Sequence, residues 1–160
     1  MAELRSGRLA DARRDLTGLA TIAAHPDMER QSVWGINSFA ALLKVAERQF
    51  AGELALASGD HAGAVAALQE AVAQEDTLNY DEPSAWYMPS RQALGAVLLE
   101  SGRPAEAQSV FEEDLRRNRE NGWSLFGLVG ALEAQRRPSE EARARLQAAW
   151  EHADIKLTAA

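Results

Sequence analysis

Small and apolar residues recur at helical spacing through most of the chain, and glycine and proline interrupt the pattern at only a few positions. Two segments carry the same pattern residue by residue: GELALASGD, which begins at Gly52, and GAVLLESGR, which begins at Gly95. Each is followed by a stripe of residues spaced by four and then three, at 64, 68 and 71 and at 107, 111 and 114. Such a stripe lies on one face of a helix. Each copy therefore predicts two antiparallel helices joined by a tight turn.

Each copy also holds two glycines, and the two have different expected roles. The first, Gly52 or Gly95, lets its helix approach a neighbouring helix closely. The second, Gly59 or Gly102, follows the last helical turn, where a left-handed residue ends a helix at little cost. Asp114 departs from the pattern, because its counterpart in the first copy is an alanine, and we expect the packing around it to differ.

This combination of small, glycine, small, large apolar and small residues resembles the tetratricopeptide repeat (TPR). The resemblance implies an all-α fold, a right-handed α-solenoid of antiparallel helix hairpins, with about seven helices in this chain. The residues from Tyr80 to Gly95, continued through Phe111 to Leu128, also resemble the C-terminal region of a family of uncharacterised bacterial TPR proteins. That family implies no activity, so the second resemblance adds no site residue.

The repeats divide one predicted domain, 1–160, into unequal parts. These are a partial repeat at 2–24 that is mainly a second helix, a repeat with a long first helix at 30–76, an insertion loop at 77–89, a repeat at 88–119, a C-terminal repeat or cap at 122–152 and a tail at 153–160. The pattern from Arg30 to Ser58 is almost continuous and predicts one long helix, broken near Gly35. A second helix without its partner leaves its apolar stripe uncovered. We therefore expect a piece of a longer array; a self-contained short protein and a homo-oligomer that covers the open N-terminal end are the alternatives.

The insertion combines turn-forming residues, carboxylates and aromatic rings, and two interpretations of it stay open. In the first, its charged and aromatic residues bind a peptide or a small polar ligand. In the second, the aromatic rings fill the gap that the longer loop creates, and a carboxylate of the loop pairs with an arginine just beyond it. The residues concerned are Tyr80, Asp81, Glu82, Trp86, Tyr87 and Arg91.

The repeats themselves predict a protein–protein interaction module, because the stacked first helices of a solenoid form a concave binding surface. The candidate residues on these first helices are Gln49, Glu53, Gln92 and Ser124. The expected partner is a protein or a peptide. The alternatives are a small-ligand or metal-binding accessory domain of a longer bacterial protein, and a structural C-terminal cap of a longer repeat array.

Composition narrows the classes of function. The formal net charge of −7 argues against a nucleic-acid partner. No apolar run approaches the roughly 18 residues that cross a membrane, so no membrane partner is expected. The chain has no cysteine to ligate zinc or to attack a substrate. We expect a cytoplasmic protein, and a periplasmic location stays open for a longer precursor.

The three histidines and three of the tryptophans are not expected to form a site. His25, His61 and His152 lie far apart and lack metal-site spacing, so each is interpreted as a surface residue. No metal, cofactor or enzymatic activity is therefore expected. The tryptophans at 34, 123 and 150 lie in apolar helical patterns, which indicates packing roles.

Overall fold

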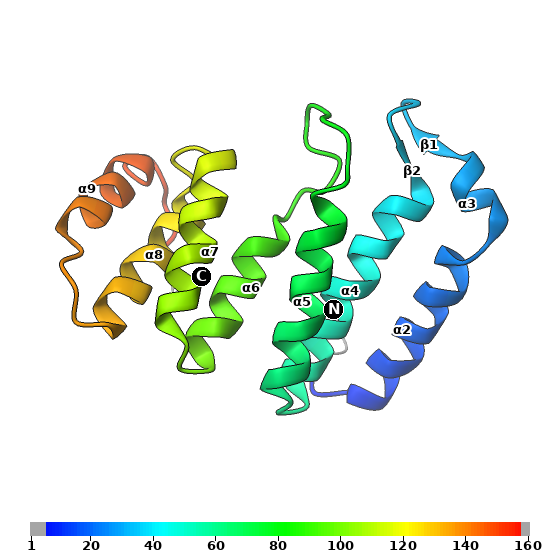
Figure 1. Cartoon of the computed structure of the whole chain (residues 1–160), viewed down its shortest axis with the longest axis horizontal. Coiled ribbons are helices and arrows are strands. Elements are labelled where there is room, and N and C mark those ends of the chain that lie inside the picture. Colours follow the sequence, from blue (N-terminus) through cyan, green and yellow to red (C-terminus); the bar gives the residue numbers. More distant parts are fainter. Residues whose placement is uncertain (1–5, 158–160) are drawn as a thin grey trace. The chain divides into compact units, whose positions relative to one another are not determined.

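Helices account for most of the chain in the computed structural model (Figure 1), which describes residues 6–157, and this confirms the predicted all-α class. Contacts divide the chain into two units, unit 1 (Met1–Ser90) and unit 2 (Arg91–Ala160). The described residues hold eight helices instead of about seven, because a helix of five residues follows the first one.

Unit 1 begins with α2 (Leu9–Ala23) and the short α3 (Pro26–Arg30). An antiparallel hairpin, β1 (Ser32–Val33) and β2 (Asn37–Ser38), leads into α4 (Phe39–Ala57), which packs against both α2 and α5 (His61–Glu75). Residues 76–89 form a loop without a helix or strand. The following helices are α6 (Ser90–Glu100), α7 (Pro104–Arg117), α8 (Gly122–Ala134) and α9 (Glu140–Ala149).

Three of the longer helices begin at a polar side chain that caps the free backbone N–H groups of the first turn. Ser38 Oγ accepts from the N–H of Ala41 at 3.1 Å, and Asp60 Oδ1 accepts from the N–H of Gly63 at 2.8 Å. Asn121 Oδ1 accepts from the first turn of α8 in the same way. A side-chain cap of this kind stabilises a helix by about 1 kcal/mol, so these residues fix where α4, α5 and α8 start.

The predicted turn glycines end their helices as expected. Gly59 and Gly102 have φ angles of 80° and 71°. The residue after each glycine donates its N–H back into the last turn, from Asp60 to the carbonyl of Ala55 at 2.9 Å and from Arg103 to that of Leu98 at 2.8 Å. This is the hydrogen-bond pattern of a left-handed helix C-cap.

The turn between α8 and α9 repeats this geometry without a glycine. Arg136 has a φ of 56°, and the N–H of Arg137 donates to the carbonyl of Leu132 at 2.9 Å. A side chain at positive φ is strained, since its Cβ crowds the backbone. The third hairpin therefore closes like the other two, but at a conformational cost.

Replacing Arg136 by glycine is expected to raise the free energy of unfolding by about 1 kcal/mol, because glycine removes this strain. Urea denaturation of the whole chain measures it. Arg136→Ala is the matched control, since it removes the same side chain but keeps a Cβ at positive φ, and it should leave stability nearly unchanged. An equal gain from alanine would mean that loss of the exposed arginine, and not backbone strain, is responsible.

The first glycine of each copy lies where two helices meet closely, as predicted. A Cβ atom added at Gly52 would lie 2.6 Å from Cγ of Leu68. In unit 2 the ring of Phe111, which is fully buried, lies between two glycines: an added Cβ would be 2.4 Å from its Cζ at Gly95 and 2.2 Å at Gly127. Phe111 of α7 thus fills the space that the missing side chains of α6 and α8 leave.

The helix predicted from Arg30 to Ser58, with a break near Gly35, forms only beyond that break, as α4, and the helical prediction for residues 32–38 is wrong. Residues 32–38 form the hairpin, with Val33 opposite Asn37. Its turn has positive φ at two successive residues, 53° at Trp34 and 79° at Gly35, a geometry that closes hairpins and that a helix excludes. The packing role predicted for Trp34 is also wrong, because the turn leaves its side chain 88% exposed.

The other two tryptophans pack on each other. The rings of Trp123 and Trp150 meet edge to face with centroids 4.8 Å apart. Trp150 also lies against Gly122 at the start of α8, and its Nε1 donates to the carbonyl of Ile155 at 2.9 Å. This pair joins the end of α9 to the start of α8.

Candidate interaction surfaces

The loop at 76–89 is fixed to the hairpin by a reciprocal amide pair. Nδ2 of Asn37 donates to the carbonyl of Asn79 at 3.0 Å, and the N–H of Asn79 donates to Oδ1 of Asn37 at 2.8 Å. Nδ2 of Asn79 donates in turn to the carbonyl of Ile36 at 3.0 Å. Asn37 is buried, so these bonds are shielded from water. The loop and the hairpin therefore form one connected edge of unit 1.

The far end of the loop is held by Gln49. Its Oε1 accepts from Nε1 of Trp86 at 2.9 Å and from the hydroxyl of Ser90 at 3.4 Å. The N–H of Ser90 donates to Oε2 of Glu75 at 2.7 Å. The structure thus brings together two predicted site residues, Gln49 and Trp86, as an internal anchor of the loop. For Trp86 this contact agrees with the interpretation in which an aromatic ring of the insertion packs against the fold, and Gln49 belongs to α4, outside the insertion.

Three aromatic side chains stay exposed: Trp34 is 88%, Tyr80 82% and Tyr87 80% exposed, and the centroid of the Tyr87 ring lies 6.0 Å from that of Trp86. Ile36 and Met88, beside them in the chain, are also exposed. We call these five residues the aromatic edge. Figure 1 shows the hairpin and the loop at the same end of unit 1. Large apolar groups gathered at one end of a molecule are typical of binding surfaces.

Two carboxylates of the loop, Asp81 and Glu82, interact with the loop itself. The hydroxyl of Tyr80 donates to Oε2 of Glu82 at 2.8 Å, and Oδ1 of Asp81 accepts from the N–H of Glu82 at 2.9 Å. The hydrogen bond to Glu82, followed by the charge of that carboxylate, raises the pKa of the Tyr80 phenol above its ordinary value of 10.0. Arg91 belongs to unit 2, where it is buried, and Glu53 is half-buried on α4.

Glu82→Gln is expected to lower the pKa of Tyr80, because the phenolate then no longer forms beside a negative charge. The Tyr80 hydroxyl of the variant should deprotonate at lower pH. The phenolate absorbance followed between about pH 8 and 12 measures this, and Tyr80→Phe assigns the transition, since the chain has 2 tyrosines. Identical titrations of Tyr80 in the variant and the wild type would show that the bond to Glu82 does not form.

In unit 2 the predicted residues Gln92 and Ser124 converge on Asp114, a residue that is 1% exposed. Oδ2 of Asp114 accepts from the hydroxyl of Ser124 and from Nε2 of Gln92, the latter at 3.4 Å, and Oδ1 accepts from Nδ2 of Asn118 at 2.9 Å. Ser124 is fully buried. Both predicted residues therefore serve an internal network, and its centre, Asp114, was not among the predicted site residues.

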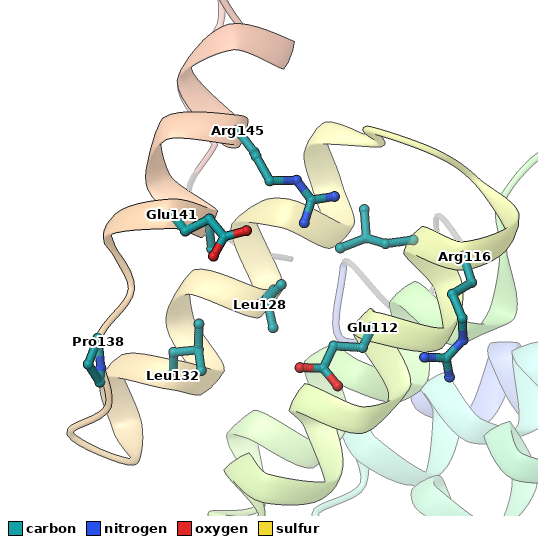
Figure 2. Close-up of a pocket in the computed structure, with 9 residues that line it drawn as sticks. Glu112, Arg116, Leu128, Leu132, Pro138, Glu141 and Arg145 are labelled. Carbon is teal, nitrogen blue, oxygen red and sulfur yellow. The ribbon is translucent and has the colours of Figure 1, made fainter.

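Unit 2 also has a groove of about 350 Å³ between α7 and α9, with α8 beneath it (Figure 2). Its floor is apolar and consists of Leu115, Leu128 and Leu132. Each rim carries a glutamate and, one turn later, an arginine. These are Glu112 and Arg116 on α7, and Glu141 and Arg145 on α9. No sequence pattern pointed to this groove, which we call the α7–α9 groove, because three helices build it.

Other kinds of site find no support in the part of the chain that the structure describes. There, no three histidine, aspartate or glutamate side chains are placed to hold a metal ion. No helix among residues 6–157 is both long and apolar enough to cross a bilayer. His25 caps α3 by accepting from the N–H of Asp27 at 3.2 Å.

In comparisons with known proteins, no family model, no curated protein and no solved structure matches the chain.

Proposed function

We propose that the chain is a protein-interaction module of the TPR type that binds its partner through the aromatic edge of unit 1. The three similar inter-helix turns, at Gly59, Gly102 and Arg136, support a repeated hairpin. So do the glycines of close approach at 52, 95 and 127. In this proposal the hairpins stack as a right-handed α-solenoid.

One observation carries the proposed binding surface: three aromatic side chains, each at least 80% exposed, lie on two segments that the Asn37–Asn79 pair holds together. Tryptophan and tyrosine contribute most to binding energy at interfaces. Their rings lose little conformational entropy on binding when the backbone that bears them is already fixed. The aromatic edge has both properties.

The inner faces of the first helices are weaker candidates than the sequence implied. Gln49 accepts a hydrogen bond from Trp86, and Gln92 and Ser124 each donate a hydrogen bond to Asp114. A partner that bound these side chains would first have to break their internal hydrogen bonds, at a cost of about 1 kcal/mol or more each. The proposal therefore places the partner at Trp34, Tyr80 and Tyr87.

Site-specific photo-crosslinking tests this surface in the cell that makes the protein. A benzophenone amino acid is introduced at Trp34 or at Tyr87, and as a matched control at Ile22, an apolar residue of α2 that is 55% exposed. We expect the same partner to be captured from positions 34 and 87, and not from 22. Adducts that are absent, or that are identical at all three positions, would contradict the proposal.

With the captured partner in hand, the contribution of each residue of the aromatic edge to the binding free energy can be measured. Trp34→Ala and Tyr87→Ala should each weaken binding about thirtyfold, which corresponds to about 2 kcal/mol. Ile22→Ala should change affinity less than twofold. Calorimetry of the purified pair measures both.

A further inference from the structure

The α7–α9 groove has an apolar floor and two carboxylates that can accept a new ion pair, and we propose that it binds a cationic amphipathic helix of a partner protein. This site lies in unit 2 and is separate from the aromatic edge. Its ligand chemistry follows from three properties of the groove: which charges are available, what its walls can bond to, and how large it is.

The available charges are negative. Figure 2 shows Glu112 extending from α7 and Glu141 from α9 toward the space over Leu128. Glu112 accepts one hydrogen bond, at 2.7 Å, from the neutral amide of Gln108. Glu141 makes no hydrogen bond or ion pair with another residue of the described chain, although its charge acts on Arg145. Two carboxylates on opposite rims can thus receive a cation without releasing one.

The arginines of the groove are already engaged. Nη2 and Nε of Arg145 lie 2.8 and 3.2 Å from Oε1 of Glu120, and Nε of Arg116 lies 2.8 Å from Oε2 of Glu113. These hydrogen bonds lower the pKa of both glutamates, as formed ion pairs do. An anionic ligand would have to displace Glu113 or Glu120, whereas a cationic ligand meets Glu112 and Glu141 directly.

The walls of the groove favour a helical ligand. They are helices, whose backbone groups are bonded within each helix, so an extended peptide finds no backbone partner there. A helical peptide satisfies its own backbone and lays one apolar face into the groove. At about 350 Å³ the groove is near the lower end of the range for ligand pockets. It therefore accepts a few side chains from one helix face.

The net charge of the whole chain also favours a cationic ligand. The formal net charge of −7 attracts cationic partners and speeds their association. The ligand is thus a helix with leucine-type side chains for Leu115, Leu128 and Leu132, flanked by lysine or arginine for Glu112 and Glu141. Raising the ionic strength should weaken its binding.

A labelled peptide of about 16 residues, long enough to hold a helix, tests the proposal by fluorescence anisotropy with the full chain. The peptide is rich in alanine and has leucines four residues apart with lysines beside them. Glu112→Lys with Glu141→Lys should weaken its binding at least about tenfold. The control, Glu151→Lys with Asp154→Lys, makes the same change in net charge at exposed positions outside the groove and should bind nearly as the wild type does.

A charge-swapped peptide keeps the test valid if the groove variant is suspected of misfolding. The same peptide with glutamate in place of lysine should bind the Glu112→Lys, Glu141→Lys variant and not the wild type. Equal binding of the cationic peptide to both double variants would overturn the proposal. So would failure of the swapped pair, or equal binding of a peptide that internal prolines keep from forming a helix. A concentration-dependent dimer that the groove substitutions abolish would assign the groove to a second copy of the chain and would also overturn it.

Discussion

Phe111→Ala is expected to lower the free energy of unfolding by about 4 kcal/mol. The ring is fully buried and fills the space between α6 and α8 that Gly95 and Gly127 leave open. Its removal costs the transfer free energy of the ring and leaves a cavity. Urea denaturation measures the loss.

The glycines on either side of the ring make this prediction more specific. In the wild type, Gly127→Ala places a methyl group 2.2 Å from Cζ of Phe111, and the overlap should cost about 2 kcal/mol. In the Phe111→Ala background the same methyl group enters the empty space, and alanine should stabilise α8 by about 0.5 to 1 kcal/mol. The sign of the glycine substitution therefore reverses. A stabilising Gly127→Ala in the wild type would contradict the close approach.

Asp114→Ala is expected to cost about 3 kcal/mol, because it leaves the buried hydroxyl of Ser124 and the amides of Gln92 and Asn118 without their acceptor. Ser124→Ala alone should also destabilise the chain, by about 1 to 2 kcal/mol, since the carboxylate loses a donor. Both are measured by urea denaturation at neutral pH.

The double variant distinguishes a bonded network from two separate packing residues. When Asp114 is already alanine, Ser124→Ala removes an unpaired hydroxyl and should recover about 1 kcal/mol. Purely additive losses, with the double variant the least stable of all, would show that Asp114 and Ser124 do not act as a pair.

Local signals in the sequence predicted most of the long helices and two of the turns that join them. Gly59 and Gly102 adopt the positive φ that ends a helix, because the freedom of a glycine backbone depends on that residue alone. The spacing of Gly95 and Phe111 likewise implied a close contact between two helices. At Arg136 the same turn geometry forms without a glycine, and the residue types at the turn did not indicate the positive φ.

The hairpin at 32–38 could not be predicted from apolar spacing. Val33 and Ile36 fit a helical period, so the pattern favoured a helix. A hairpin forms here instead of a helix because of two features that the spacing of apolar residues does not reveal. One is the turn at Trp34 and Gly35, and the other is the pairing of Asn37 with Asn79, which lies 42 residues away in the chain.

The site residues could be located along the sequence, but the direction of each side chain could not. The sequence predicted an insertion loop at 77–89, and residues 76–89 form a loop, yet only the folded chain separates the anchor Trp86 from the exposed Tyr80 and Tyr87. Asp114 carried a local signal, its departure from the repeat pattern, and the three side chains that donate hydrogen bonds to its buried carboxylate account for it. The α7–α9 groove had no such signal, since its residues lie on three helices.

The most direct test of the proposed function is hydrogen–deuterium exchange of the chain with and without the partner captured from position 34. We predict that binding slows exchange in residues 33–37 and 79–88, where the aromatic edge lies, and leaves the interior of α4 and α8 unchanged. Slower exchange along the first helices, with the loop and the hairpin unaffected, would contradict the aromatic edge as the binding surface.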